Sequence, residues 1–141
     1  MPDAVETARA TAEAMRRADR AAQGAGVALV EVGPGRAVVA MTVQDRHVNG
    51  HGICHGGYLF LLADAALAYA SNSHGVSAVA SGADITFLRP VVLGAELVAE
   101  AVERALAGRS GLYDVTVRDG GGAVAEFRGR TRQVPGLAPP P

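Results

Sequence analysis

Hydrophobic and polar positions alternate along much of this chain, but one segment is apolar on every side. Apart from Asp64, every residue from Tyr58 to Ala70 is apolar. This pattern is typical of a helix that other elements cover on nearly all sides. The segment is too short to cross a bilayer, which needs about 20 apolar residues. The pattern therefore predicts a buried central helix over residues 57–73 that carries a single carboxylate.

The segments around this helix are typical of strands. They are rich in β-branched and aromatic residues or alternate in polarity. Two strands flank a Gly-Pro-Gly turn in residues 26–44, and four more occupy 76–89, 95–108, 110–119 and 123–134. The segment 95–108 resembles a helix in composition, but its hairpin context favours a strand. Because strands and helices do not alternate, the order predicts an α+β fold with an antiparallel sheet wrapped around the central helix.

The two ends of the chain differ from this middle part. Residues 1–24 are rich in alanine and arginine and predict a peripheral helix that ends at glycines. Residues 25–134 form the predicted domain, in which 45–57 is a loop rich in His, Gly and Asn. The last segment, PGLAPPP at 135–141, is predicted to be a disordered tail.

Composition limits the classes of function. The chain has 141 residues, a net charge of −1 and a pI of about 6.4, which points away from nucleic acid and membrane surfaces as partners. With one cysteine, Cys54, no intrachain disulfide forms, and a cytoplasmic location is expected. The N-terminus lacks the apolar stretch of a signal peptide. All 13 basic residues are arginine, which we interpret as a composition bias of the genome.

Two motifs connect the chain to a known family. HVNGHGICHGGYLFLLADAALAYASNSHG, followed by ASGADITFLRPV, resembles the hotdog-fold acyl-CoA thioesterases, and most of all their phenylacetate-pathway branch. The resemblance covers residues 25–133. It implies hydrolysis of phenylacetyl-CoA, hydroxyphenylacetyl-CoA or related aryl and medium-chain acyl-CoAs. Coenzyme A would be part of the substrate, with no cofactor and no metal. The alternative is a non-catalytic acyl-CoA-binding or regulatory hotdog protein.

The resemblance also implies an assembly. Members of this family form homodimers whose sheets join edge to edge, and two such dimers often form a homotetramer. The Phe-Pro-Gly loop that carries the catalytic histidine of hotdog dehydratases is absent from this sequence.

Gly56 and Gly57 open the predicted central helix. Backbone N–H groups at a helix start lack intrahelical partners, and the helix dipole adds positive charge there. Such a site can polarise a thioester carbonyl and hold the oxyanion formed on attack. The alternative is that the glycines only make a tight turn. The resemblance favours Gly56 as the donor.

Asp64 follows Gly56 by eight residues, which is about 12 Å along a helix axis. An aspartate side chain is too short to reach a carbonyl held at Gly56 of its own chain. If both act on one thioester, they come from different subunits, and the active site lies at a dimer interface. Asp64 would activate water or attack the carbonyl itself. The alternative is a structural aspartate bonded to a neighbouring hydroxyl or amide.

The loop before the helix supplies two more candidates. Asn49 can orient a water or the thioester oxygen through its amide, but the Asn-Gly pair is also a common turn signal. His55 either contacts the thioester or supports the loop. A zinc site from His47, His51 and His55 would need a helix that the intervening glycines disfavour. Cys54 is not expected to act as a nucleophile with His55, because adjacent side chains diverge.

Other residues are candidates for contact with coenzyme A. Arg89 could meet a phosphate or a nearby acid. Arg128, Arg130 and Arg132 share one face of the last strand, where they suit phosphates or are simply solvated. Ser110 and Gly111, at a strand start, resemble the family's contacts on the nucleotide side. On residues 83–87 the alternate side chains Ala83, Ile85 and Phe87 line an acyl pocket or pack in the core.

Overall fold

The structure is a computed structural model that describes residues 1–140; Pro141, the end of the predicted tail, lies outside the described residues. The described chain forms the helices α1 (Ala4–Ala18), α2 (Arg20–Ala25) and α3 (Gly56–Asn72) and a 3-10 turn, Asp45–His47. Its strands are β1 (Ala28–Gly33), β2 (Arg36–Thr42), β3 (Ala78–Phe87), β4 (Glu96–Ala107), β5 (Ser110–Asp119) and β6 (Gly122–Gln133).

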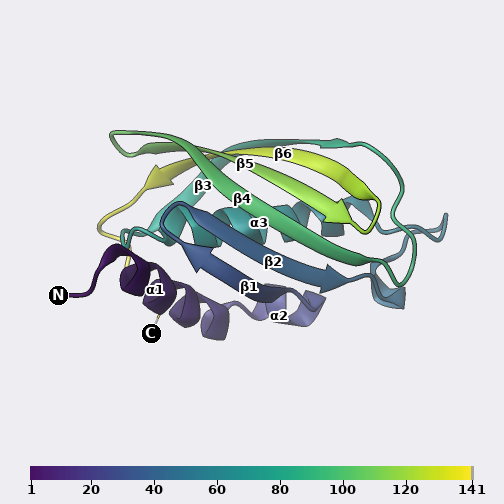
Figure 1. The fold of residues 1–141 in the computed structure, drawn as a ribbon, viewed down its shortest axis with the longest axis horizontal. Coiled ribbons are helices and arrows are strands. Elements are labelled where there is room, and N and C mark those ends of the chain that lie inside the picture. The colour runs from purple at the N-terminus through teal and green to yellow at the C-terminus, as the bar shows by residue number, and fades with distance from the viewer. Residues whose placement is uncertain (141) are drawn as a thin grey trace.

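The strands form one antiparallel sheet in the order β1-β2-β4-β5-β6-β3. The sheet curves around α3, which contacts every strand (Figure 1). This confirms the predicted α+β architecture, including the strand over residues 95–108. The order leaves β1 and β3 as the two edges of the sheet, and the edge strand β3 runs beside α3.

The core lies between α3 and the inner face of the sheet. Leu62, Ala63 and Ala66 of α3 are fully buried there, as are Tyr113 and Val115 of β5. Because α3 is covered on nearly every side, its apolar side chains find partners in all directions, which explains its continuous apolar sequence. None of the helices in residues 1–140 is long and apolar enough to span a membrane.

The N-terminal segment covers the side of α3 that the sheet leaves open. It forms two helices rather than the one that the sequence predicts. The chain breaks at Asp19, whose side chain accepts a hydrogen bond from the Ala22 N–H at 2.9 Å and caps α2. Gly26, in the left-handed conformation with φ of 82°, ends α2 within the predicted glycine-rich stretch.

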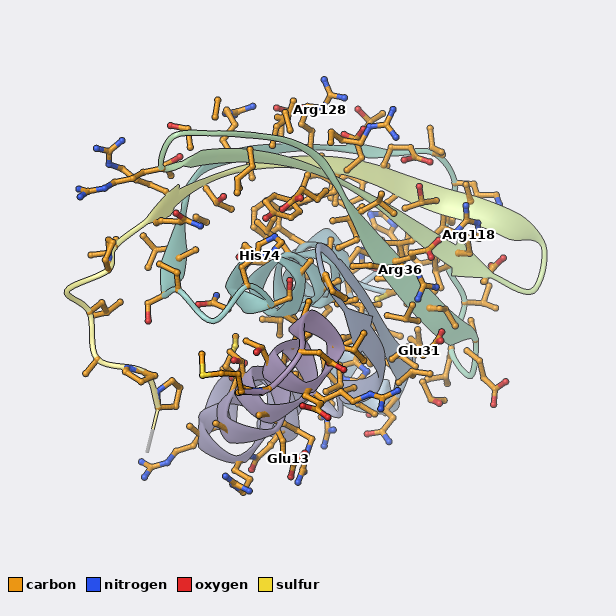
Figure 2. The ribbon with its side chains drawn as sticks, turned by 60° about the vertical axis from the view of Figure 1, so that its left-hand side comes forward. Glu13, Glu31, Arg36, His74, Arg118 and Arg128 are labelled. Carbon is orange, nitrogen blue, oxygen red and sulfur yellow. The ribbon has the colours of Figure 1, made fainter. Side chains whose placement is uncertain are left out.

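The outer face of the sheet carries rows of arginine–carboxylate pairs between neighbouring strands. Arg36 of β2 contacts Glu100 of β4 at 2.7 Å. Arg128 of β6 contacts Asp114 of β5 at 2.7 Å and points away from α3 (Figure 2). Arg130 pairs with Asp84 at 3.1 Å in the same way. These pairs occupy the solvent side, because alternate residues of β6 such as Phe127 face the core.

Candidate active site

The loop before α3 is fixed by His47, whose ring is fully buried. Its Nδ1 accepts a hydrogen bond from the Gln44 N–H at 2.9 Å, and its Nε2 donates to the Ala25 carbonyl at 2.8 Å. The His47 carbonyl accepts from the His55 N–H at 2.8 Å. His47 is thus a structural anchor. No three His, Cys, Asp or Glu side chains of residues 1–140 are grouped as metal ligands.

Of the two roles that the sequence left open for Asn49, the structure shows the turn, whereas the orientation of a water or thioester oxygen stays a prediction. Its side-chain oxygen accepts hydrogen bonds from the N–H groups of His51, at 2.9 Å, and Ile53, at 3.4 Å, which shape the turn. The residue also lines a cleft together with Gly56. Because the turn uses only the oxygen, the amide NH₂ of Asn49 stays available to a ligand in that cleft.

Gly56 begins α3, and its N–H has no protein acceptor among residues 1–140. The cleft in front of it has a volume of about 480 Å³ and is also lined by Leu59, Phe87 and Arg89. The Phe87 ring stands directly over the glycine, because a Cβ added at Gly56 would lie 2.9 Å from Phe87 Cζ. A larger residue at this position would have to displace the Phe87 ring.

The first turn of α3 uses the neighbouring glycine differently. The Gly57 N–H donates to His55 Nδ1 at 3.2 Å, and His55 thereby caps the helix. This contact uses Nδ1 of the exposed His55 ring and leaves its Nε2 without a protein partner among residues 1–140. Of the two glycines, Gly56 is therefore the one whose N–H is free to bind a substrate oxygen.

Asp64 lies on α3 in a second cleft, of about 570 Å³, whose lining is mainly apolar. The carboxylate is half-buried, and no hydrogen-bond donor or cation among residues 1–140 pairs with it. Burial raises the pKa of Asp64, and repulsion from Asp19 adds to the effect. A structural aspartate would be bonded to a hydroxyl or amide. Asp64 has no such partner among residues 1–140, and its carboxylate is partly desolvated.

A single chain therefore holds the two main candidates, Gly56 and Asp64, in separate clefts. Asn49, Gly56 and Arg89 line the first cleft, whereas Asp64 lines the second. This separation agrees with the spacing argument that Gly56 and Asp64 of one chain do not reach the same carbonyl.

The candidates for contact with coenzyme A are dispersed. Arg89 forms a bidentate ion pair with Asp119 and donates a hydrogen bond to the Gly122 carbonyl at 3.0 Å. Of the two alternatives for Arg89, a phosphate or a nearby acid, the structure shows the acid. Arg128 lies on the outer face of the sheet, paired with Asp114. In both pairs the guanidinium lowers the pKa of the carboxyl group.

Ser110 and Gly111 line a small cleft of about 300 Å³ together with Arg130. Gly111 is buried, and a Cβ there would lie 2.5 Å from Thr131 Oγ1 and 2.8 Å from Tyr113 Cε1. Packing therefore accounts for this glycine. Its contact with coenzyme A stays a prediction, as does that of Ser110.

The sequence did not predict two features of the site: the position of Phe87 over Gly56 and the contribution of residues 137–140 to the Asp64 cleft. Phe87 covers Gly56, while its strand neighbours Ala83 and Ile85 pack against the core. The C-terminal residues 137–140 line the cleft of Asp64, although they were predicted to be disordered. The thiol of Cys54 is buried, and burial raises its pKa, so it does not resemble an activated nucleophile.

Comparison with known proteins identifies similar chains. The sequence model of the thioesterase superfamily matches residues 51–126. The acyl-coenzyme A thioesterase PaaI of Escherichia coli K12 is 44% identical over 89% of this chain and 90% of its own. The solved structure of E. coli PaaI, described as a protein of the phenylacetic acid degradation operon, superposes with a TM-score of 0.91 at 41% identity, covering 94% of this chain and 96% of that one.

Two further solved structures are similar. A variant of the phenylacetic acid degradation protein PaaI from Thermus thermophilus has a TM-score of 0.80 at 40% identity, covering 82% of this chain and 100% of that one. A Streptococcus mutans UA159 protein bound to acetyl-CoA has a TM-score of 0.75 at 27% identity, covering 77% of this chain and 89% of that one.

Proposed function

Since the chain belongs to the thioesterase superfamily, we propose that it hydrolyses acyl-CoA thioesters to a free acid and coenzyme A. The names of its relatives favour phenylacetyl-CoA and hydroxyphenylacetyl-CoA, followed by related aryl and medium-chain acyl-CoAs. The observation that carries the proposal is the desolvated Asp64 carboxylate, which is unpaired among residues 1–140 and lies in the otherwise apolar stretch Tyr58–Ala70 of α3. A protein that only bound acyl-CoA would have no use for this carboxylate.

In this proposal the Gly56 N–H stabilises the oxyanion. The thioester oxygen gains negative charge when its carbonyl carbon is attacked, and a hydrogen-bond donor fixed in place lowers the energy of that state. The start of α3 adds partial positive charge at the same point. The apolar wall that Phe87 and Leu59 provide limits competition from water for this donor.

Asp64 is the proposed base. A raised pKa makes the ionised carboxylate a stronger proton acceptor than an ordinary aspartate. Asp64 takes a proton from water as the water oxygen bonds to the carbonyl carbon. The tetrahedral intermediate then collapses, the C–S bond breaks, and the departing thiolate takes up the proton. Neither a metal nor a cofactor is required for these steps.

A direct attack by the same carboxylate is the second route. Asp64 would form a mixed anhydride and expel coenzyme A, and water would then cleave the anhydride. Rapid-quench mass spectrometry separates the two routes. An acylated Asp64 peptide during turnover supports the anhydride, whereas its absence with full thiol release supports activation of water.

We further propose that the catalytic pair comes from two subunits of a homodimer, with two sites per dimer and two dimers in a homotetramer. The separate clefts of Gly56 and Asp64 support this arrangement. So does the edge strand β3, which borders the Asp64 cleft and exposes Val79. An unpaired edge of this kind is suited to pairing with another copy of the chain. The Asn49 amide of one subunit would orient the water that Asp64 of the other activates.

Release of free thiol from a panel of acyl-CoAs tests the activity. The panel contains phenylacetyl-CoA, hydroxyphenylacetyl-CoA, benzoyl-CoA and a series of aliphatic acyl-CoAs, each with the wild type and Asp64→Asn. We expect thiol release that the substitution lowers by orders of magnitude. If no thioester is cleaved faster by the wild type than by the variant, the enzyme proposal fails and a binding protein is left.

Mixed dimers test the shared site. Asp64→Asn and Gly56→Ala subunits are each expected to be inactive alone. After unfolding and refolding together, a mixed dimer contains one site with both native residues, so activity should return to about a quarter of the wild type if the subunits assort at random. Failure to recover any activity, with mixed dimers shown by mass spectrometry, would contradict a site built from two subunits.

A further inference from the structure

The chain does not leave the molecule after β6 but turns back across it. The Val134 N–H donates to the Ser77 carbonyl at 2.7 Å, and the Leu137 N–H donates to the Val134 carbonyl at 2.9 Å. The first contact holds the chain beside the start of β3, and the second closes a turn, after which the chain runs down the side of the molecule toward α1 (Figures 1 and 2). The residues Leu137–Pro140 are called the C-terminal strap below.

The strap forms one wall of the cleft that contains Asp64. The opposite surfaces come from Leu67 and Ala68 of α3, from β3, and from Met15 of α1. Every residue of the strap is apolar, and Leu137 has its largest side chain, which is 49% exposed. An acyl chain that reaches past Asp64 in this cleft therefore meets Leu137 or the prolines behind it.

The apolar, proline-containing composition of the strap suits a segment that lines a cleft. Pro139 and Pro140 have no N–H group, so they add apolar surface to the cleft without a donor that needs a partner. Their fixed φ also lowers the entropy lost when the segment becomes ordered. Because the strap and Asp64 line the same cleft, removal of strap side chains is expected to admit water beside the carboxylate.

We propose that the C-terminal strap determines acyl specificity by bounding the far end of the acyl cleft, with Leu137 as the residue that sets its length. The proposal rests on the thioesterase function above and deepens it. It predicts that the selectivity among acyl groups depends on a segment outside the central helix and the sheet. Leu137 is a specificity residue and takes no part in bond breaking.

Two substitutions in the full-length chain test the strap in opposite directions. Leu137→Ala enlarges the cleft, and Leu137→Phe shortens it. Leu106→Ala is the matched control, because Leu106 is similarly exposed, at 44%, but lies on β4 away from the Asp64 cleft. For each protein, kcat/KM is measured for phenylacetyl-CoA and for aliphatic acyl-CoAs of increasing length.

We expect Leu137→Ala to raise the ratio of kcat/KM for long over short acyl groups about tenfold, since such differences in apolar contact change specificity by this order. Leu137→Phe should lower the same ratio, and Leu106→Ala should leave it unchanged. Entry of water beside Asp64 in Leu137→Ala should also move the acid limb of the kcat/KM profile to lower pH.

The outcomes distinguish this inference from the function on which it rests. If the wild type cleaves no acyl-CoA, the proposed function fails and the strap has no role in it. If the wild type is active and depends on Asp64, but both Leu137 variants keep the wild-type ratio and pH profile, the strap proposal alone is overturned. A changed ratio in the Leu106 control would overturn it as well, because the effect would then not be local to the strap.

Discussion

Replacing Gly56 by alanine tests whether its N–H is the oxyanion donor. The added methyl group would lie 2.9 Å from Phe87 Cζ and 3.3 Å from Phe87 Cε1. The van der Waals contact distance between two carbon atoms is about 3.5 Å or more, so the Phe87 ring has to move by roughly half an ångström or more. Phe87 is 50% exposed and can turn outward, so the cost in folding stability is small. The better helix propensity of alanine offsets part of it, by up to about 1 kcal/mol.

The effect on catalysis should be much larger than the effect on folding. The methyl group would lie between Gly56 and the Phe87 ring, which line the same cleft, and we expect it to hinder the approach of a carbonyl oxygen to the N–H of residue 56. Loss of one oxyanion donor lowers kcat by about 10²- to 10³-fold, or roughly 3–4 kcal/mol of transition-state stabilisation. We therefore expect this decrease in kcat for phenylacetyl-CoA, measured by thiol release, with a melting temperature close to that of the wild type.

Gly57→Ala is the matched control, because a Cβ there meets His55 Nδ1 at 3.5 Å, an ordinary contact. It should keep kcat within about threefold of the wild type, since the N–H of Gly57 already caps the helix. The double variant Gly56→Ala with Phe87→Ala removes the steric conflict but not the blocked N–H, and should stay inactive. Wild-type activity in Gly56→Ala, or its recovery in the double variant, would refute the role assigned to the Gly56 N–H.

Three further predictions follow from the ionisable groups. Because folding raises the pKa of Asp64, the ionised carboxylate destabilises the fold at neutral pH, and Asp64→Asn should melt a few degrees higher than the wild type at pH 7. This difference in melting temperature should shrink in acid, where the carboxyl group is protonated. A lower melting temperature of the variant at pH 7 would contradict the prediction. Burial works to raise the pKa of Glu103, but hydrogen bonds from His74, at 2.7 Å, and Tyr113, at 2.8 Å, outweigh it and lower that pKa. Glu103 should therefore stabilise the fold at pH values above its unfolded-state pKa, and this stabilisation should be lost as the pH falls through its folded-state pKa. Glu103→Gln should lower the free energy of unfolding, measured by urea denaturation, by about 1–3 kcal/mol at pH 7 and by less at pH 3. An equal loss at both pH values would be inconsistent with this reasoning. Cys54→Ala should keep thioesterase activity within a few-fold, and the native thiol should react slowly with a disulfide reagent at pH 8; a loss as large as that of Asp64→Asn would instead make Cys54 the nucleophile.

The fold was predictable because its main signals are local and periodic. The apolar run around Asp64 predicted α3, and the alternating segments predicted all six strands, including 95–108, whose alanine and glutamate content suggested a helix. The comparisons confirm the hotdog fold and the family resemblance. The break at Asp19 was missed because aspartate is common in helices as well as at their ends, and only the bond to the Ala22 N–H shows that it caps a second helix.

The site was predictable in its residue types but not in its arrangement. The spacing of Gly56 and Asp64 already separated them along one helix, and the two clefts agree with that argument. The position of Phe87 over Gly56 depends on how β3 curves past the start of α3, which no local pattern encodes. The strap was missed because a Pro-rich end is typical of disorder. Only Leu137, an apolar side chain among these prolines, signalled a contact with the rest of the protein.

The arginine–carboxylate pairs on the outer sheet have a chemical consequence for an enzyme that handles activated acyl groups. A thioester can acylate a neutral amine, but a guanidinium stays protonated at physiological pH and does not react in this way. All 13 basic side chains of the sequence are arginine and none is lysine, so no side-chain amine is exposed to acyl-CoA. The composition of the chain thus protects its side chains against amine acylation by the substrate, and lysine-directed dyes should label no side chain of these 141 residues.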